Sequence, residues 1–193
     1  ASSLVGSEMC IRDSSSSMDV KIGMTKDGII TAGEAHLRYQ GGAFPNGTVE
    51  MGAQSAFAAY DLKAVRTKGW NVLTNRPKQA AYRAPGAPQA IYAVESVVDE
   101  LCQKLNLDPL EIRIKNAAKK GTKSSYGPTF DDIGLIATLE AAKKHPHYLA
   151  PLAENQGRGL SCGFWFNFGG DTCVTLNVNF DGTIGVTEGN PDI

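Results

Sequence analysis

Apolar and polar residues alternate along the first patterned part of the chain, as is typical of a strand with one buried face. The alternation runs over residues 20–24, Asp27-Gly28 follows as a tight-turn pair, and apolar residues resume at Ile29. This pattern predicts a β-hairpin. We expect its return strand to pass through residues 34–39 and to end before Gly41.

The middle of the chain gives a less uniform signal. Residues 51–60 are rich in alanine and fit a short helix or a strand equally well, whereas residues 70–73 predict a strand. The stretch Thr74–Gln89 contains Pro77, Pro85 and Pro88. Because proline fixes φ and removes an N–H donor, this stretch predicts a stiff loop with no long helix or strand.

Helical spacing begins directly after this loop. One apolar face is formed by Val94, Val97, Val98, Leu101 and Leu105. Asp108 followed by Pro109 is an N-cap with proline at the first helical position, so a second helix should reach about Ala118. A third helix is predicted from about Asp132 to Lys144.

Strict alternation returns over residues 174–180, and Asp181-Gly182 separates it from a further apolar alternation at residues 184–186. This pattern predicts a second hairpin. The order strands, helices, strands predicts an α+β fold with mixed sheets and packed helices, rather than a doubly wound parallel sheet. Residues 121–128 are the best candidate for a linker, which gives expected divisions at 18–120 and 121–193.

Composition excludes several classes of protein. The chain has 193 residues, 42% of them hydrophobic, and a formal net charge of −1. A chain of this size and composition can bury a core without disulfide or metal staples. Its balanced charge argues against a nucleic-acid partner, and no apolar run approaches the roughly 20 residues needed to span a membrane. The four cysteines form no CxxC pair, and we expect them to be reduced and mostly buried.

Residues 1–17 show neither helical nor strand periodicity. The string from Leu4 to Asp13 resembles one translated frame of a transposase sequencing adapter. We therefore expect residues 1–17 to be a non-native adapter-derived segment with a linker, and the chain to be a fragment truncated at both ends. A native serine-rich linker is the alternative.

The loop around Arg83 is the main candidate for chemistry, because no nucleotide-binding, hydrolase or zinc motif is present. A loop braced by proline and leading into a helix can direct backbone N–H groups and one long cation toward an anionic or oxo ligand. The alternative is purely structural: Tyr82 packs, and Arg83 pairs with a surface carboxylate.

Three sequence motifs occur in one order: residues 82–89, residues 93–101 and residues 108–116. Together they resemble the molybdopterin-binding large subunit of the xanthine dehydrogenase and aldehyde oxidase family. The resemblance extends from about Met18 to the end of the chain. It implies that residues 18–120 are the C-terminal part of one molybdopterin-binding subdomain and that residues 121–193 are the N-terminal part of the next.

The resemblance also implies roles for the loop. Arg83 would be catalytic, and Arg83, Ala84, Pro85 and Gly86 would bind the cofactor beside the molybdenum centre. The metal would be held by the two sulfurs of the pterin, with no side chain as a ligand. The catalytic glutamate of the family would lie beyond Ile193, so no glutamate of this chain takes its place.

Departures from the family pattern bear on the substrate. Purine-oxidising members carry an aromatic residue where Pro85 stands and an arginine where Met51 falls, so purines are disfavoured. Members that oxidise carbon monoxide carry a cysteine next to the loop arginine, where this chain has Ala84. Pro85 and Phe164 would contact substrate, with Phe164 as an aromatic wall of the pocket, although core packing explains Phe164 equally well.

The expected function is therefore that of a molybdopterin-dependent oxidoreductase that hydroxylates an aldehyde or an N-heteroaromatic compound with oxygen from water. The cofactor would be molybdenum-molybdopterin, either plain or as a cytosine dinucleotide. Iron–sulfur clusters and FAD would lie on partner subunits or missing regions, in a hetero-oligomer. We expect a cytoplasmic location, with export of the folded protein left open, and no activity from this fragment alone. Two alternatives remain: a reductive member acting on an aromatic thioester, as in hydroxybenzoyl-CoA reductase, and a non-catalytic scaffold without cofactor.

Overall fold

The structure is a computed structural model that describes residues 15–45, 47–79, 83–166, 171 and 173–189. Cys10, Tyr82 and most of the expected adapter segment lie outside the described residues. The divisions expected at residues 17 and 120 stay predictions.

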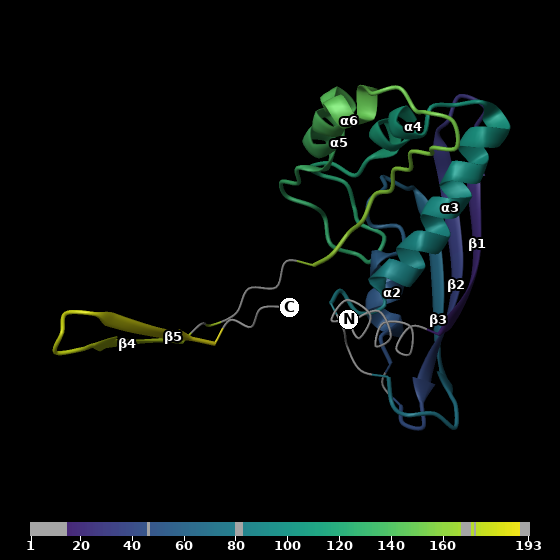
Figure 1. Ribbon diagram of the computed structural model, residues 1–193. Coiled ribbons are helices and arrows are strands. Elements are labelled where there is room, and N and C mark those ends of the chain that lie inside the picture. Colours follow the sequence, from purple (N-terminus) through teal and green to yellow (C-terminus); the bar gives the residue numbers. More distant parts are fainter. Residues whose placement is uncertain (1–14, 46, 80–82, 167–170, 172, 190–193) are drawn as a thin grey trace.

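A three-stranded sheet forms one layer of the molecule (Figure 1). Strands β1 (Ser16–Met24) and β2 (Ile30–Gly42) pair antiparallel around the Asp27-Gly28 turn, which confirms the first predicted hairpin. Strand β3 (Ala64–Leu73) pairs parallel to β2, so the sheet order is β1-β2-β3. The sheet is mixed, as the predicted α+β class requires.

The connection from β2 to β3 contains helix α2 (Val49–Ser55), which decides the ambiguity of the alanine-rich stretch in favour of a helix. A parallel pair of strands needs such a crossover connection. Strand β3 begins at Ala64, six residues before the predicted start. Its early part was missed because Arg66 and Lys68 are exposed and Gly69 interrupts the apolar alternation.

Helix α3 (Ala87–Leu105) lies across one face of the sheet (Figure 1). Its buried stripe consists of Ala87, Ala90, Val94, Glu95, Val98 and Cys102. The predicted helix is confirmed, but its predicted buried face is partly wrong, because Val97 and Leu101 are only half-buried. Residues four apart stack into one stripe on a helix, and small residues such as Ala90 extend that stripe where the sequence shows no large apolar side chain.

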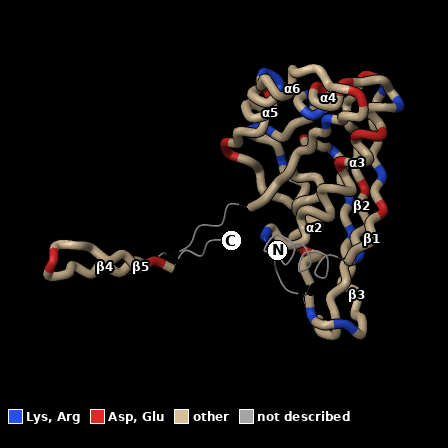
Figure 2. The backbone as a smooth tube through the Cα atoms, viewed as in Figure 1, with Lys and Arg blue, Asp and Glu red and all other residues tan. Residues whose placement is uncertain are grey.

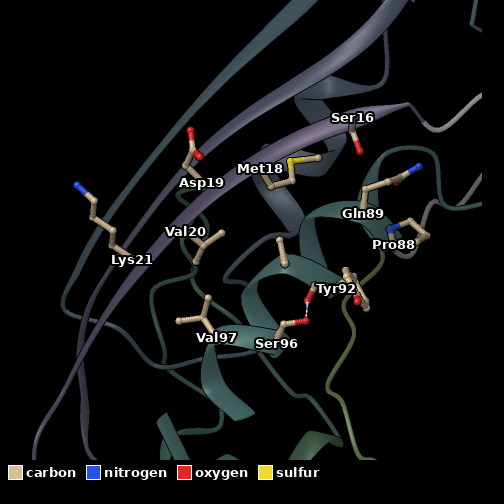
Figure 3. A pocket seen from close by; sticks show the side chains of 11 residues that line it. Ser16, Met18, Asp19, Val20, Lys21, Pro88, Gln89, Tyr92, Ser96 and Val97 are labelled. Atoms are coloured by element: carbon tan, nitrogen blue, oxygen red, sulfur yellow. Dashed lines mark hydrogen bonds between the residues drawn. The ribbon is translucent and has the colours of Figure 1, made fainter. Parts of the chain in front are cut away.

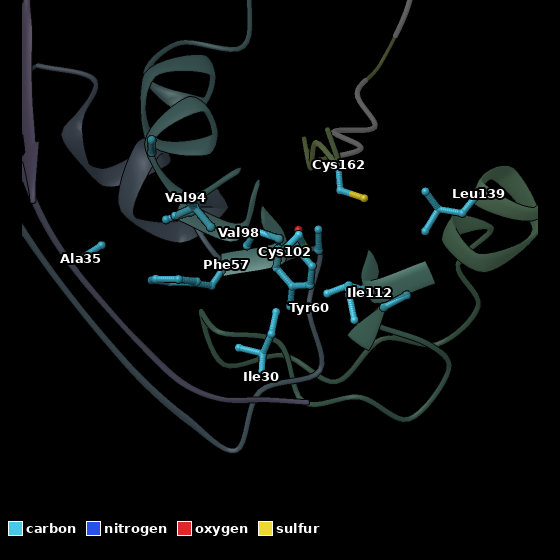
Figure 4. Packing of buried hydrophobic residues seen from close by; sticks show 14 of the residues in the cluster. Ile30, Ala35, Phe57, Tyr60, Val94, Val98, Cys102, Ile112, Leu139 and Cys162 are labelled. Carbon is cyan, nitrogen blue, oxygen red and sulfur yellow. The ribbon is translucent and has the colours of Figure 1, made fainter. Parts of the chain in front are cut away.

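The core lies between the sheet, α3 and the residues that follow α2 (Figure 4). Ala35, Leu37 and Tyr39 of β2 are fully buried on the inner face of the sheet. Phe57 packs directly on Gly33, where an added Cβ would come within 2.7 Å of the phenyl ring. This close approach brings the segment after α2 against the sheet.

Three shorter helices follow, namely α4 (Pro109–Asn116), α5 (Leu135–Lys144) and α6 (Pro146–Leu149). The Asp108 carboxylate accepts hydrogen bonds from the N–H groups of Leu110 and Glu111, which confirms the predicted N-cap. Helix α4 ends at Asn116, two residues before the predicted end, and α5 begins three residues after the predicted start. Helix α6 was not predicted.

Asn116 ties the end of α4 to the first hairpin. Its side-chain oxygen accepts a hydrogen bond from the N–H of Ile30 at 2.8 Å, and its Nδ2 donates to the carbonyl of Gly28 at 2.8 Å. Asn116 is buried, so these bonds satisfy backbone groups that water cannot reach.

The segment that follows α4 turns back on itself through hydrogen bonds between Gly121 and Phe130 and between Ser124 and Pro128. Strands β4 (Val174–Val178) and β5 (Ile184–Glu188) form the second predicted hairpin, which is exposed along its whole length. Figure 2 shows that charged residues of both signs are interspersed over the body of the molecule. No helix within the described residues is long and apolar enough to cross a membrane.

Candidate cofactor-binding loop

Residues 83–86 form a strained loop directly before α3. Ala84 has φ 56° and Gly86 has φ 80°, and Gly86 is the N-cap residue of the helix. A positive φ is uncommon for alanine and costs free energy unless the surroundings hold it. Pro85 lies between these two residues with its own φ restricted by the ring. The loop therefore has one defined shape.

Packing against β2 and α2 holds this shape. The hydroxyl of Tyr39 donates a hydrogen bond to the carbonyl of Gly86 at 2.5 Å. A Cβ added to Gly86 would lie 2.2 Å from the carbonyl oxygen of Thr48, and one added to Gly52 would lie 2.8 Å from the Gly86 oxygen. Space thus requires glycine at both positions, and the positive φ requires it at Gly86 as well.

The backbone around Gly86 suits an oxygen-bearing ligand. The φ angles at Ala84 and Gly86 are positive, and Pro85 between them has no N–H, so the N–H groups of Ala84 and Gly86 are the two backbone donors that this part of the loop can offer a ligand. Within the described residues, the N–H groups of Ala84 and Gly86 donate to no backbone acceptor. Arg83 is exposed and adds a cation beside them.

Buried oxygen atoms without a hydrogen-bond partner among the described residues occur in the segments around the loop. They belong to Thr48, Asn71, Thr74, Gln79 and Gln89. Gln79 is only 6% exposed, and its N–H donates to the carbonyl of Gly41. Unsatisfied buried acceptors are rare in folded proteins and call for a donor. A pterin ring offers several N–H donors, so these residues fit such a group.

Within the described residues, no group of three or more histidine, cysteine, aspartate or glutamate side chains could hold a metal ion. The groups that the loop region offers to a ligand are backbone N–H groups, amide side chains and the Arg83 cation.

An open groove of about 1210 Å³ lies between β1 and the first half of α3, beginning at Pro88 and Gln89 (Figure 3). Met18 and Val20 line it from the strand, and Tyr92 and Val97 line it from the helix. The carboxylate of Asp19, at its rim, is paired with Arg38 at 2.7 Å, which lowers the pKa of Asp19. The groove offers mainly apolar contacts and no cluster of reactive groups.

A buried charged network lies further along α3. The guanidinium of Arg113 is fully buried and donates from Nε to Glu95 and from an Nη atom to Asp99, both at 2.8 Å. The Tyr60 hydroxyl donates to the other oxygen of Glu95, and the N–H of Cys162 donates to Glu95 Oε2 at 2.7 Å. One carboxylate therefore joins four parts of the chain.

Burial sets the proton affinities in this network. Burial, together with the charge of Glu95, raises the pKa of Tyr60 well above its usual value, and burial raises the pKa of the Cys162 thiol to about 11. Burial alone would lower the pKa of Arg113, but the nearby Glu95 carboxylate outweighs it and raises that pKa. Arg113 is therefore charged, while Tyr60 and Cys162 are neutral.

Phe164 lies in an aromatic cluster rather than alone. Its ring centroid is 5.6 Å from that of Tyr126, 5.8 Å from that of Phe130 and 5.1 Å from that of Phe166. Phe164 is half-buried. These distances are typical of packed aromatic side chains, so both interpretations of Phe164 remain open.

The predicted cofactor-binding residues lie together because they are consecutive in the sequence: Arg83, Ala84, Pro85 and Gly86. The ring of Phe164 contacts other aromatic residues. The Glu95–Arg113–Cys162 network was not predicted from the sequence. The one available signal was a glutamate on an otherwise apolar helix face, next to Val94. The free cysteines follow the prediction in part, since Cys102 and Cys162 are buried and Cys173 is exposed.

Comparison with known proteins identifies the family of the chain. Residues 9–117 match the molybdopterin cofactor-binding domain family. The chain is 33% identical over 184 residues to the aldehyde oxidoreductase of Megalodesulfovibrio gigas, which covers 88% of this chain and 20% of that protein. It is also 33% identical over 131 residues to the nicotinate dehydrogenase large molybdopterin subunit of Eubacterium barkeri, covering 66% of this chain and 31% of that protein.

The fold also matches solved structures of this family. The aldehyde oxidoreductase structure from Desulfovibrio desulfuricans superposes with a TM-score of 0.74 at 27% identity, over 89% of this chain and 20% of that chain. The chain belongs to the molybdopterin-binding domains of the xanthine dehydrogenase and aldehyde oxidoreductase family. It spans about 20% of the length of the aldehyde oxidoreductase relative.

Proposed function

We propose that the protein containing this chain is a molybdenum hydroxylase that oxidises an aldehyde or an N-heteroaromatic compound with oxygen from water. The observation that carries the proposal is the rigid 83–86 loop. It has positive φ angles at Ala84 and Gly86, whose N–H groups donate to no backbone acceptor in the part of the chain that the structure describes, and it carries the exposed Arg83. Membership of the molybdopterin-binding family supports the same assignment.

In this proposal Arg83, Ala84, Pro85 and Gly86 hold the cofactor, and Arg83 also acts in catalysis. Preorganised N–H donors stabilise negative charge on a ligand oxygen without having to reorient. Gln79 and Gln89 provide carbonyl acceptors for a pterin. When bound, the cofactor supplies the two-electron redox chemistry that protein side chains lack. Whether it carries a cytosine dinucleotide is left open by this assignment.

The substrate class rests on Pro85 and Phe164. Pro85 offers a small apolar surface in place of an aromatic ring, so the pocket suits an aldehyde or a flat heteroaromatic ring better than a purine held by stacking. Aldehyde oxidoreductase and nicotinate dehydrogenase are both among the relatives.

Partners follow from the electron balance of the reaction. Hydroxylation removes two electrons from the substrate, and these must leave through another redox group. We propose that an iron–sulfur subunit and a FAD subunit, or further regions of the same protein, receive them in a cytoplasmic hetero-oligomer.

The deciding experiment is elemental analysis of the complete subunit purified with its partners. Near-stoichiometric molybdenum, with iron, is expected. Absence of molybdenum from cells that make the cofactor would refute the proposal and favour a non-catalytic scaffold. A reductive activity toward an aromatic thioester, without aldehyde or heteroaromatic oxidation, would instead favour the reductive alternative.

Replacing the loop cation tests its role in turnover. In the complete enzyme, Arg83→Ala should lower kcat at least about 10²-fold, because an electrostatic contact to developing charge is lost. Its melting temperature should stay near that of the wild type, since Arg83 is exposed. Arg66→Ala, an exposed arginine on β3, is the matched control and should retain activity. Equal losses of activity and melting temperature in Arg83→Ala would make the residue structural.

The aromatic wall has a separate test. Phe164→Ala should raise KM about tenfold while molybdenum content stays unchanged, because a wall of the substrate pocket is removed. Phe130→Ala removes a neighbouring ring of the same cluster and serves as the control. If both variants lower thermal stability alike and neither changes KM, Phe164 packs the core and does not touch substrate.

A further inference from the structure

Glu95 is buried where four segments of the chain meet. Its side chain comes from α3 and accepts hydrogen bonds from Tyr60, from Arg113 of α4 and from the backbone N–H of Cys162. Glu95 is 4% exposed and Cys162 is 5% exposed. A charge-assisted hydrogen bond in such surroundings is stronger than its counterpart in water.

Among these hydrogen bonds that Glu95 accepts, the one from Cys162 holds the segment that carries Phe164. Helix α3 begins directly after Gly86, so Glu95 belongs to the same rigid element that follows the 83–86 loop. Cys162 lies two residues before Phe164 on a segment without helix or strand structure. Such a segment has no hydrogen-bonding ladder of its own to fix its position, and the bond to Glu95 supplies an attachment.

We propose that Glu95 is a positioning residue for the substrate pocket, because it fixes the Phe164 segment relative to the helix that carries the cofactor loop. The inference rests on the proposed function, in which Arg83 acts in catalysis and Phe164 is a wall of the substrate pocket. Glu95 itself touches neither substrate nor cofactor. Its effect reaches the pocket through the Cys162 N–H.

Asp99 provides a matched comparison on the same helix. Its carboxylate also pairs with Arg113 at 2.8 Å, but the Asp99 side chain is 45% exposed, and the Cys162 N–H donates to Glu95 and not to Asp99. Glu95→Ala and Asp99→Ala each remove one of the two carboxylates that pair with Arg113. Only Glu95→Ala removes the acceptor of the Cys162 N–H.

The experiment uses the complete enzyme with its partners. Hydrogen–deuterium exchange of residues 159–166 should become about tenfold faster in Glu95→Ala and should stay unchanged in Asp99→Ala. With benzaldehyde and nicotinate as test substrates and an artificial electron acceptor, KM should rise about tenfold in Glu95→Ala while kcat and molybdenum content stay near wild type.

Equal hydrogen–deuterium exchange rates in Glu95→Ala and Asp99→Ala would show that Glu95 does not hold the Cys162 segment. Faster exchange in Glu95→Ala with an unchanged KM would show that Glu95 does not position the substrate pocket. Failure of the proposed function itself has a different signature. The wild-type protein would then lack molybdenum and activity, whatever the exchange results.

A neutral background keeps the test decisive if Glu95→Ala does not fold, since that variant leaves a buried cation with one partner. Tyr60→Phe combined with Arg113→Met removes the other donors to Glu95. On this background Glu95→Gln keeps an acceptor for Cys162, and Glu95→Leu does not. The Glu95→Gln variant should show slow hydrogen–deuterium exchange of residues 159–166 and a low KM. The Glu95→Leu variant should show fast exchange and a high KM. Identical behaviour of the two would refute the proposal.

Discussion

Arg113 has no exposed surface, yet it carries a positive charge. Such a group is tolerated only where carboxylates and carbonyls surround it, because removing an unpaired charge from water costs several kcal/mol. Here Glu95, Asp99 and the carbonyl of Pro109 accept its hydrogen bonds. The network therefore defines one arrangement of α3 and α4, because sliding either helix would leave the charge unpaired.

The buried Cys162 thiol should make stability depend on pH. Its pKa of about 11 in the folded protein lies above the usual value of roughly 8.5 for an unfolded cysteine. The contribution is fully present below pH ~8.5, and it is lost as the pH rises toward 11, because the unfolded chain releases its proton first. We expect a loss of about 1 kcal/mol per pH unit in this window.

Urea unfolding between pH 8.5 and 10.5 measures this loss. Wild type should be destabilised more steeply than Cys162→Ala, and Cys173→Ala should behave as wild type because Cys173 is exposed. Parallel curves for all three proteins would show that the Cys162 proton does not contribute.

Glycine is required at position 86, between the loop and α3, for two reasons: its positive φ angle and the lack of space for a Cβ. A comparison with a second glycine separates them. Gly86 and Gly121 have similar φ angles of 80° and 85°, but an added Cβ would overlap the Thr48 carbonyl only at Gly86. Gly121→Ala should cost about 1–2 kcal/mol from backbone conformation alone. Gly86→Ala should cost more and should also displace α2. Thermal unfolding of the two variants compares them, and equal costs would mean that the Thr48 contact yields without strain.

Helices and strands could be predicted from the sequence where a single local pattern was sufficient. Alternation predicted the β1–β2 and β4–β5 hairpins, and the Asp108-Pro109 signal predicted the start of α4. Local rules failed where packing decided the outcome. The alanine-rich stretch contributes to α2 because a parallel β2–β3 pair needs a crossover connection. The start of β3 was missed because Arg66 and Lys68 are exposed and Gly69 interrupts the apolar alternation.

A loop before a helix was predicted around Arg83, and residues 83–86 form one, although α3 begins at Ala87, within the predicted loop. The Glu95 network could not be predicted, because its partners lie 18 to 67 residues apart and no local period connects them. Tyr39 donates a hydrogen bond to Gly86 and so holds the loop, but its sequence context predicted only that it lies in a strand. Long-range polar contacts of this kind are set by the fold as a whole.

The C-terminal hairpin leaves one apolar face without cover. Leu176 and Val186 pair across the strands, as do Val178 and Ile184, and each of these four side chains is more than 60% exposed. A two-stranded hairpin is marginal in water unless its apolar face packs on something. The isolated 193-residue chain should therefore associate with itself as its concentration rises.

Sedimentation velocity over a concentration series tests this expectation. Leu176→Thr combined with Val186→Thr should shift the chain toward monomer, while Thr175→Ser on the opposite face should leave association unchanged. A monomer at every concentration would show that the hairpin needs no cover.

The hydrogen bonds of Asn116 also bear on the order of events during synthesis. The β1–β2 turn is locked through Ile30 and Gly28 by a side chain that emerges from the ribosome 86 residues after Ile30. Contacts of such sequence separation form late, because the intervening chain must first be brought together. The first hairpin can therefore form early during synthesis, but its turn gains the Asn116 hydrogen bonds only after α4 has been synthesised.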